Sequence, residues 1–460
     1  MPRLVVIGGG ISGLAAAWAA ADAAHRAGER LEVVVLERDR EVGGKARSHR
    51  EDGWLVEGGP SGFLRGKPEF ERLIAAAGMT DAVVDARAAA RRRFVYRAGA
   101  LRLIRPSPVS LVRSGILGVG GAVRLAGEVV VPRARPHGHD ETVWEFAVRR
   151  IGVQAADRLV APMCLGVFAG DAKRLSLQSA FPRMAALERD HGGLIRGLIA
   201  KRGRMSTGSL ASFRDGMQSL PLALAERGGF TVARDVEVMR LGHDGRRWAI
   251  ATRRSGTVTA DAVVLAVEPW VASGIVGSIA PAAATALGDI PCPSVAVVAL
   301  GFGPAARARI PDGFGVLVSR GEGVRMLGNL WETSLYPGRG PDGGILVRAM
   351  LGGAVDPDIA SLDDAAVLAL AEDEVGRLYG LAEAPVFRRV VRIAKAIPQY
   401  ECGHAGRVAA VEHAVGALPN LDVTGFGLRG VAFGDAASDG MRTGARMVAR
   451  LRAAVAAAVA

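Results

Sequence analysis

The residues with the clearest chemical meaning stand at the start of the chain, where glycines recur at positions 8, 10 and 13. This spacing allows a tight turn at Gly8, a close approach of the Gly10 backbone to a pyrophosphate, and close helix–strand packing at Gly13. Glu37 follows 24 residues after Gly13, where a carboxylate can accept hydrogen bonds from ribose hydroxyls. The pattern predicts a dinucleotide site. The alternative is a glycine-rich turn in another kind of α/β protein.

The elements around these residues have the order that such a site needs. An apolar, strand-like run over residues 4–7 precedes the glycines, and an Ala-rich helix is predicted after them to about Ala24. A second apolar run, residues 31–36, ends on Glu37. The helix N-terminus would point its positive dipole end at the phosphates.

Two further glycine clusters follow, at Gly43-Gly44 and at Gly58-Gly59-Pro60. Repeated glycines so close to the first cluster indicate a backbone that passes close to something bulky. A mononucleotide half-site does not need them, whereas a long cofactor such as FAD does. The sequence therefore favours FAD over NAD.

Length and charge bound the remaining possibilities. The chain has 460 residues, enough for two or three domains, and 50% of them are apolar. The net charge is +12, and residues 84–150 hold thirteen arginines and five acids, a net of +8. A localised basic surface suits lipid headgroups, nucleic acid or a polycarboxylate ligand. No nucleic-acid motif is present, so no nucleic-acid partner is expected. The alternative is a solvated arginine-rich face.

Cysteine and histidine usage argues against disulfide and metal chemistry. The three cysteines, Cys164, Cys292 and Cys402, show no metal or disulfide spacing, which favours a reduced cytoplasmic setting. The eight histidines show no metal spacing either, so no metal is expected, and His404 near Tyr400 is interpreted as structural. Met1 leads directly into the first strand, so no signal peptide is expected. The longest apolar candidate, residues 107–131, is interrupted by charges and predicts at most an interfacial helix.

The rest of the chain reads as a helical insertion followed by returning strands. Residues 106–201 are predicted to be helical, including one helix over Phe181–Ile199. A strand is predicted over Thr231–Leu241, with others up to residue 394, and a terminal helix over Gly440–Ala460. The first sixty residues are therefore expected to be one part of a discontinuous domain.

Several separated motifs then agree with one family. They are Val35-Leu36-Glu37 with Gly43-Gly44, Gly166–Asp171, Gly313–Val318, Met350–Gly353, Ile397–Tyr400 and Gly430–Ala432. In this order and spacing, from residue 4 to about residue 445, the chain resembles the flavin amine-oxidase superfamily, and within it the protoporphyrinogen oxidase family. A departure lies near the C-terminus, at residues 425–428 and 434–436, where many relatives carry other side chains.

The resemblance implies a mixed α/β fold of three parts. A discontinuous Rossmann-like FAD-binding domain would comprise residues 1–75, 205–270 and 395–460. A mixed β-sheet substrate-binding domain would comprise residues 76–105 and 271–394, and an α-helical membrane-associated domain residues 106–204. The protein would be cytoplasmic and peripheral on the inner face of the cell membrane, and homodimer formation is left open.

The cofactor residues carry over one by one. Arg38 would lie beside the adenosine ribose with Glu37, and Val236 would meet the adenine edge through its backbone, from a strand. Val431, Ala432 and Phe433 would lie at the flavin ring near a helix N-terminus. The full set of residues implied to contact non-covalent FAD is Gly8, Gly9, Gly10, Ile11, Ser12, Gly13, Glu37, Arg38, Lys45, Gly59, Pro60, Ser61, Gly62, Val236, Phe426, Val431, Ala432 and Phe433.

The implied reaction is the six-electron oxidation of protoporphyrinogen IX to protoporphyrin IX, a step of haem biosynthesis, with oxygen as acceptor and hydrogen peroxide as product. The flavin would do the chemistry, so no side chain is expected to be catalytic. Arg93 would pair with a propionate, because a guanidinium binds a carboxylate bidentately. The implied substrate contacts are Arg93, Gly166, Phe314, Gly315, Leu317 and Met350, although the apolar ones have the pattern of ordinary core residues.

Other functions remain open on the sequence. Coproporphyrinogen III carries four carboxylates, and the arginines at 91, 92 and 97 suit it. An oxidase of amines or carotenoids is a second alternative, although no C-terminal cysteine lies in a setting for a covalent flavin link. The third is a non-catalytic FAD- or porphyrin-binding relative.

Overall fold

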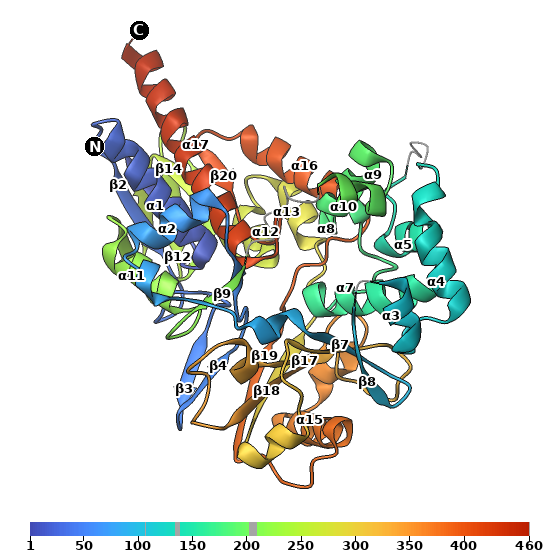
Figure 1. The fold of residues 1–460 in the computed structure, drawn as a ribbon. Helices are drawn as coiled ribbons and strands as arrows, with labels where there is room; N and C mark the ends of the chain where they lie inside the picture. The colour runs from blue at the N-terminus through green and yellow to red at the C-terminus, as the bar shows by residue number, and fades with distance from the viewer. Residues whose placement is uncertain (106, 134–138, 202–208, 460) are drawn as a thin grey trace.

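A five-stranded parallel sheet carries the glycine-rich start of the chain (Figure 1). The computed structural model describes residues 1–105, 107–133, 139–201 and 209–459, without the side chains of residues 455–459. The strand order is β10 (Thr231–Ala233), β2 (Glu32–Leu36), β1 (Arg3–Ile7), β14 (Ala262–Leu265) and β20 (Leu421–Val423). Residues 4–6 of β1 are fully buried, because helices and a second sheet cover both faces.

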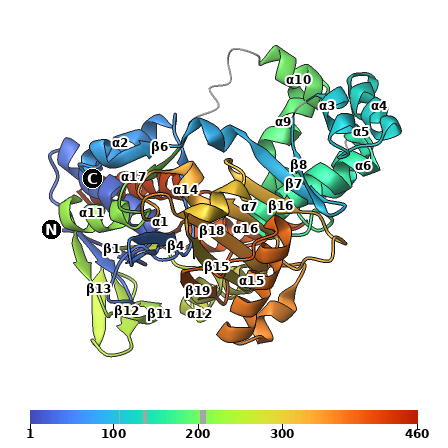
Figure 2. The same ribbon diagram turned by 60° about the horizontal axis from the view of Figure 1, so that its bottom comes forward.

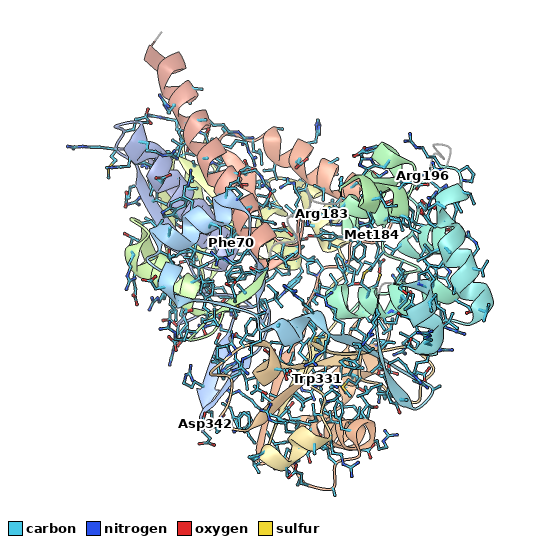
Figure 3. The ribbon with its side chains drawn as sticks, in the orientation of Figure 1. Phe70, Arg183, Met184, Arg196, Trp331 and Asp342 are labelled. Atoms are coloured by element: carbon cyan, nitrogen blue, oxygen red, sulfur yellow. The ribbon has the colours of Figure 1, made fainter. Side chains whose placement is uncertain are left out.

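Helices α1 (Ile11–Arg26) and α17 (Phe433–Val459) pack against each other on one face of this sheet. Their backbones touch: a β-carbon added at Gly440 or Gly444 would lie 2.1 or 2.0 Å from the carbonyl oxygen of Ser12 or Ala16. On the same face are α2 (Pro68–Ala76) and α11 (Ser219–Arg227). In Figure 3, Phe70 of α2 lies beside the N-terminal part of α17, and its ring meets that of Phe433 edge-on.

The other face packs on an antiparallel sheet and three helices. The sheet is formed by β11 (Val238–His243), β12 (Trp248–Thr252) and β13 (Thr257–Ala260). The helices are α12 (Pro269–Val276), α13 (Pro281–Gly288) and α16 (His404–Gly416). Smaller strands join this body to the next: β3 (Ser48–Glu51) pairs with β4 (Trp54–Glu57), and β9 (Leu210–Phe213) lies between β5 (Phe63–Leu64) and β6 (Val83–Asp85).

A seven-stranded mixed sheet forms the second body, at the bottom of Figure 1. Its order is β19 (Phe387–Ile393), β15 (Val295–Phe302), β18 (Ile345–Gly352), β17 (Gly328–Trp331), β16 (Gly315–Val318), β7 (Arg93–Arg97) and β8 (Ala100–Leu103). β7 pairs parallel with β16, and every other pair is antiparallel. α14 (Glu332–Leu335) follows β17, and α15 (Asp364–Tyr379) covers one face, where Trp331 is buried (Figure 3).

The third body is a block of short helices, set apart on the right of Figure 1 and at the upper right of Figure 2. Its helices are α3 (Pro108–Arg113), α4 (Val119–Ala126), α5 (Val143–Ile151), α6 (Val153–Ala155), α7 (Ala161–Phe168), α8 (Leu177–Ala180), α9 (Pro182–His191) and α10 (Leu194–Ala200). A capping box between Thr142 and Glu145 begins α5.

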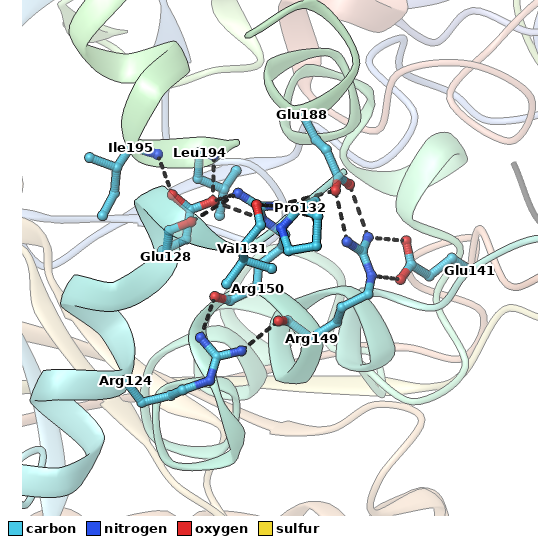
Figure 4. Close-up of polar contacts among 10 residues, drawn as sticks. All are labelled: Arg124, Glu128, Val131, Pro132, Glu141, Arg149, Arg150, Glu188, Leu194 and Ile195. Carbon is cyan, nitrogen blue, oxygen red and sulfur yellow. Dashed lines mark hydrogen bonds and ion pairs between the residues drawn. The ribbon is translucent and has the colours of Figure 1, made fainter. Parts of the chain in front are cut away.

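A buried ion-pair network holds this block together (Figure 4). Arg150 pairs with Glu128, and both side chains are fully buried. The Glu128 carboxylate also accepts the backbone N–H groups of Leu194 (2.8 Å) and Ile195 (3.0 Å), which begin α10. Arg149 pairs with Glu141 and Glu188 at 2.9 and 2.7 Å. Part of the basic segment 84–150 therefore serves the interior of the block rather than its surface.

Three predicted elements were wrong in extent. The strand expected over Thr231–Leu241 is two strands in different sheets, β10 and β11, and Val236 lies between them. The helix expected over Phe181–Ile199 is broken at Gly192-Gly193, where Gly192 has a left-handed φ of +82°. The terminal helix begins at Phe433 instead of Gly440, because its glycines serve helix packing and do not mark a helix start. The proposed boundaries at residues 106 and 204–205 lie outside the described residues.

Candidate functional site

A cavity of about 1080 Å³ extends from the glycine turn after β1 to the seven-stranded sheet and the helical block. All three bodies contribute to its wall. The nucleotide wall comprises Gly8, Gly10, Ile11, Ser12, Glu37, Gly43, Gly44, Lys45, Gly58, Gly59, Pro60 and Ser61. The substrate wall comprises Arg93, Gly166, Phe314, Gly315, Leu317 and Met350.

The glycine turn has the geometry that the sequence predicted. A β-carbon at Gly13 would lie 1.9 Å from the Gly8 carbonyl oxygen, so this helix–strand contact admits no side chain. Gly8 has a φ of +108°, and a β-carbon there would lie 2.6 Å from the carbonyl oxygen of Ala266. At Gly10, the N-cap of α1, the space around the β-carbon position is open for 4 Å. The cavity therefore reaches the backbone at the helix N-terminus, where an anion is favoured.

Glu37 lies at the end of β2 with both carboxylate oxygens engaged. They accept the N–H groups of Gly9 (2.6 Å) and Asp39 (2.9 Å). Burial raises the pKa of this carboxyl above its ordinary value, and the two N–H groups oppose the shift. A carboxylate has about four acceptor sites, so Glu37 can still accept from a hydroxyl in the cavity.

The three glycine clusters contact one another. Gly43 donates its N–H to the Gly9 carbonyl (2.9 Å), and a β-carbon at Gly44 would lie 3.3 Å from the Gly10 Cα. A β-carbon at Gly59 would lie 2.0 Å from the Lys45 carbonyl oxygen. These glycines are thus required by close backbone contacts within the nucleotide wall.

Lys45 places a cation in this wall. Its Nζ is buried with no hydrogen-bond partner among the described residues, and lies 4.8 and 4.5 Å from the ring centroids of Trp270 and Phe426. Burial lowers the pKa of Lys45 to about 8. A buried ammonium without a hydrogen-bond acceptor suits an anionic ligand. Arg38, half-exposed, lies farther out near Asp39 and Glu268.

The loop before α17 closes the far end of the nucleotide wall. Phe426, Val431 and Phe433 line the cavity there. The Tyr400 hydroxyl donates to the Phe426 carbonyl, and its ring stacks on His404 with centroids 4.1 Å apart. The Nε2 atom of His404 lies 3.0 Å from the Leu428 carbonyl oxygen. Burial lowers the pKa of the His404 imidazole. His404 thus holds the loop, consistent with the structural interpretation.

The substrate wall is largely apolar and ends at an arginine. The Arg93 guanidinium, at the start of β7, lies 4.8 Å from the Phe314 ring centroid. Leu317 packs so closely on α7 that a β-carbon at Gly166 would lie 2.6 Å from a Leu317 methyl carbon. The helical block completes this region with Leu159, Met163 and Ile195.

A known protein family matches the sequence of this chain. The model of flavin-containing amine oxidoreductases matches residues 11–400. The chain belongs to that family. FAD is its cofactor, and the fold is the mixed α/β fold of flavin amine oxidases.

Curated relatives match nearly the whole chain. Coproporphyrinogen III oxidase of Bacillus subtilis (strain 168) is 28% identical over 95% of this chain and 96% of its own length. Human protoporphyrinogen oxidase is 32% identical over the same shares of the two chains. A solved structure from Exiguobacterium sp. 255-15 superposes with a TM-score of 0.85 over 97% of this chain and 98% of that one, at 23% identity, which supports the fold.

The nucleotide wall fits FAD on its own geometry. The open approach to Gly10 and the unpartnered Lys45 ammonium suit a pyrophosphate, and the Glu37 carboxylate suits a ribose. The Val236 N–H already donates to the Glu37 carbonyl (2.8 Å), so only its carbonyl and side chain remain for an adenine. In the described part of the chain, four expected contacts do not line the cavity: Gly9, Gly13, Gly62 and Ala432.

Sequence reasoning missed two cavity arginines. Arg105 lies at the exposed edge, and Arg348 of β18 is buried in the wall. The available signal for Arg348 was a single charge inside the apolar strand Ile-Leu-Val-Arg-Ala-Met-Leu.

Proposed function

We propose that this flavoprotein oxidises a porphyrinogen to the corresponding porphyrin, and that its substrate is protoporphyrinogen IX. The observation that carries the proposal is a single cavity that joins the FAD cradle to a large apolar wall with Arg93 at its edge. A tetrapyrrole with peripheral carboxylates has this combination of apolar ring and anionic rim. The names of the matched relatives support the same chemistry.

The chain's own residues would bind, orient and shield the substrate. Bound non-covalently, FAD would supply the electron-acceptor chemistry, taking two electrons at a time and returning them to oxygen as hydrogen peroxide. Arg93 would pair with a propionate and so set which edge of the macrocycle faces inward. Phe314, Leu317 and Met350 would cover the ring faces and exclude water.

Coproporphyrinogen III is the second candidate substrate, because a relative named coproporphyrinogen III oxidase matches 95% of this chain. In addition, Arg105 places a second guanidinium at the cavity edge. Two of the arginines that suit a substrate with four carboxylates already form ion pairs with the protein. Arg92 pairs with Asp312 at 2.5 Å, and Arg97 pairs with Glu322 at 3.5 Å. This engagement favours the substrate with two carboxylates.

The test is anaerobic mixing of the purified holoprotein with each porphyrinogen. Bleaching of the flavin absorbance, followed by porphyrin fluorescence in air, is the expected result. The ratio of kcat/KM for the two substrates then assigns the preference. A flavin that stays oxidised with both substrates, each shown to bind, would remove this function and leave a non-catalytic binding protein.

We further propose that the three bodies are the FAD-binding, substrate-binding and membrane-associated domains. Among the described residues, exposed aliphatic side chains gather on the helical block: Val109, Val119, Val123, Val130, Val153, Val167, Leu198 and Ile199. No helix in the described ranges is both long and apolar enough to cross a bilayer. Basic residues nearby would add affinity for an anionic leaflet.

Co-sedimentation with liposomes tests the membrane attachment. We expect the protein to bind vesicles that contain anionic lipid at low salt. The V119E/V123E variant should bind them more weakly, because the Val119 and Val123 side chains are about 70% exposed. M239E/V386E, which places the same two charges on exposed apolar residues outside the helical block, is the matched control. Equal binding by all three proteins would contradict this attachment site.

A further inference from the structure

Arg348 is a buried cation in the cavity wall. It lies in the middle of β18, opposite Ala299 of β15 and Leu330 of β17, and only 4% of its surface is exposed. Its side chain lines the cavity two residues before Met350. Burying a charge among apolar strand residues destabilises the protein unless a nearby polar or charged group pairs with it.

Two contacts fix the Arg348 guanidinium. Nη2 donates to the Gly59 carbonyl oxygen at 2.5 Å, and Nη1 lies 3.5 Å from the Glu332 carboxylate. Nε of Arg348 and one Glu332 oxygen are buried without a hydrogen-bond partner in the described part of the chain. The Glu332 pair is therefore long, whereas the bond to Gly59 is short.

The contact with Gly59 connects the two halves of the cavity. Gly59 packs on the Lys45 carbonyl on one side, with no room for a β-carbon, and is held by Arg348 on the other. The Arg348 side chain thereby joins the seven-stranded sheet to the Gly59–Ser61 segment of the nucleotide wall. The resemblance to the flavin amine oxidases implies that this segment runs along the flavin half of FAD, and the inference rests on that assignment.

We propose that Arg348 is a positioning residue for the flavin and the fixed positive charge that raises its reduction potential. The bond to Gly59 sets the distance between the nucleotide wall and the substrate wall. Reduction adds negative charge to a bound flavin, and a desolvated cation in the same cavity stabilises that charge. Glu332 partly offsets the guanidinium, so the Arg348–Glu332 pair sets the size of the effect.

The experiment measures the midpoint potential of FAD in the holoprotein by dye-coupled reduction, with R348M, R348K, E332Q and wild type. We expect R348M to weaken binding of reduced relative to oxidised FAD about tenfold, a potential lower by about 30 mV for a two-electron couple. E332Q should raise the potential, because the guanidinium loses its counter-charge. R348K should keep most of the potential but bind FAD more weakly, because one ammonium replaces the planar fork.

The control is R392M, which removes a guanidinium from the same sheet. Arg392 pairs with Asp364 and is not among the described residues that line the cavity. It should keep the wild-type potential. If R348M fails to fold because Glu332 is left unpaired, E332Q decides alone, and no rise in its potential overturns the proposal. So does a shift of R348M and E332Q in the same direction. No porphyrinogen is used, so the result is independent of the substrate proposal.

Discussion

The nucleotide wall and the substrate wall face the same cavity but are built differently. The nucleotide wall consists mainly of backbone, packed so tightly at Gly59, and at the neighbouring Gly13 of α1, that side chains are excluded. The substrate wall consists of side chains that project from strands β7, β16 and β18 and from α7. A backbone wall tolerates almost no substitution, whereas a side-chain wall tunes affinity in steps. Changes on the first should therefore abolish cofactor binding, and changes on the second should alter substrate kinetics.

The largest effect is expected for G13A. The added methyl group would lie 1.9 Å from the Gly8 carbonyl, so α1 must shift away from β1, at a cost of about 3 kcal/mol or more in stability. FAD should be lost on purification, which absorbance at the flavin bands measures. G376A in α15 has open space and is the control, with a gain of about 0.5–1 kcal/mol expected. Retention of FAD by G13A would break the comparison.

R93M should change substrate affinity alone. Loss of a charge-assisted bond to a propionate costs about 1.5–3 kcal/mol, so KM should rise roughly 10- to 100-fold with kcat and FAD content nearly unchanged. R92M is the matched control, since Arg92 pairs with Asp312 and does not line the cavity within the described ranges. A fall in kcat with unchanged KM would instead place Arg93 in the chemical step.

Lys45 gives the nucleotide wall a pH dependence. Its pKa of about 8 means that the ammonium is charged below pH 8 and neutral above it. The affinity of the apoprotein for anionic FAD should therefore be highest below pH 8 and fall as pH rises, about tenfold between pH 8 and 9 at most. Fluorescence titration measures it, and K45M should bind weakly without that slope. K395M should keep the slope, because exposed Lys395 lies over Trp270 and lines no described part of the cavity.

The smallest effect is expected at the β7–β8 hairpin, which supports Arg93. Ala98 and Gly99 both have left-handed φ values, +48° and +70°, the conformation of a two-residue hairpin turn. A98N should stabilise the protein by about 0.5–1 kcal/mol, because asparagine tolerates this region better than alanine. Thermal unfolding measures the gain, and KM should stay unchanged. A change in KM would show that the substrate wall is sensitive to its turn.

The sequence predicted the nucleotide wall well because each requirement is local. A tight turn at Gly8, close packing at Gly13 and an acid at the end of the next strand are encoded by residue type and spacing, and the structure has all three. The substrate wall could be inferred only from resemblance, because Arg93, Gly166, Phe314 and Met350 are far apart in the chain.

Tertiary structure alone decided three further points. The N–H of Val236 is used by Glu37 because β10 ends there and the chain crosses to another sheet. Arg149 and Arg150, two charges of the basic segment, pair with acids inside the helical block. Arg348 reaches Gly59 across 289 positions of sequence. A residue's type fixes what its backbone allows and which bonds it can make, but which partner it meets depends on how distant segments pack.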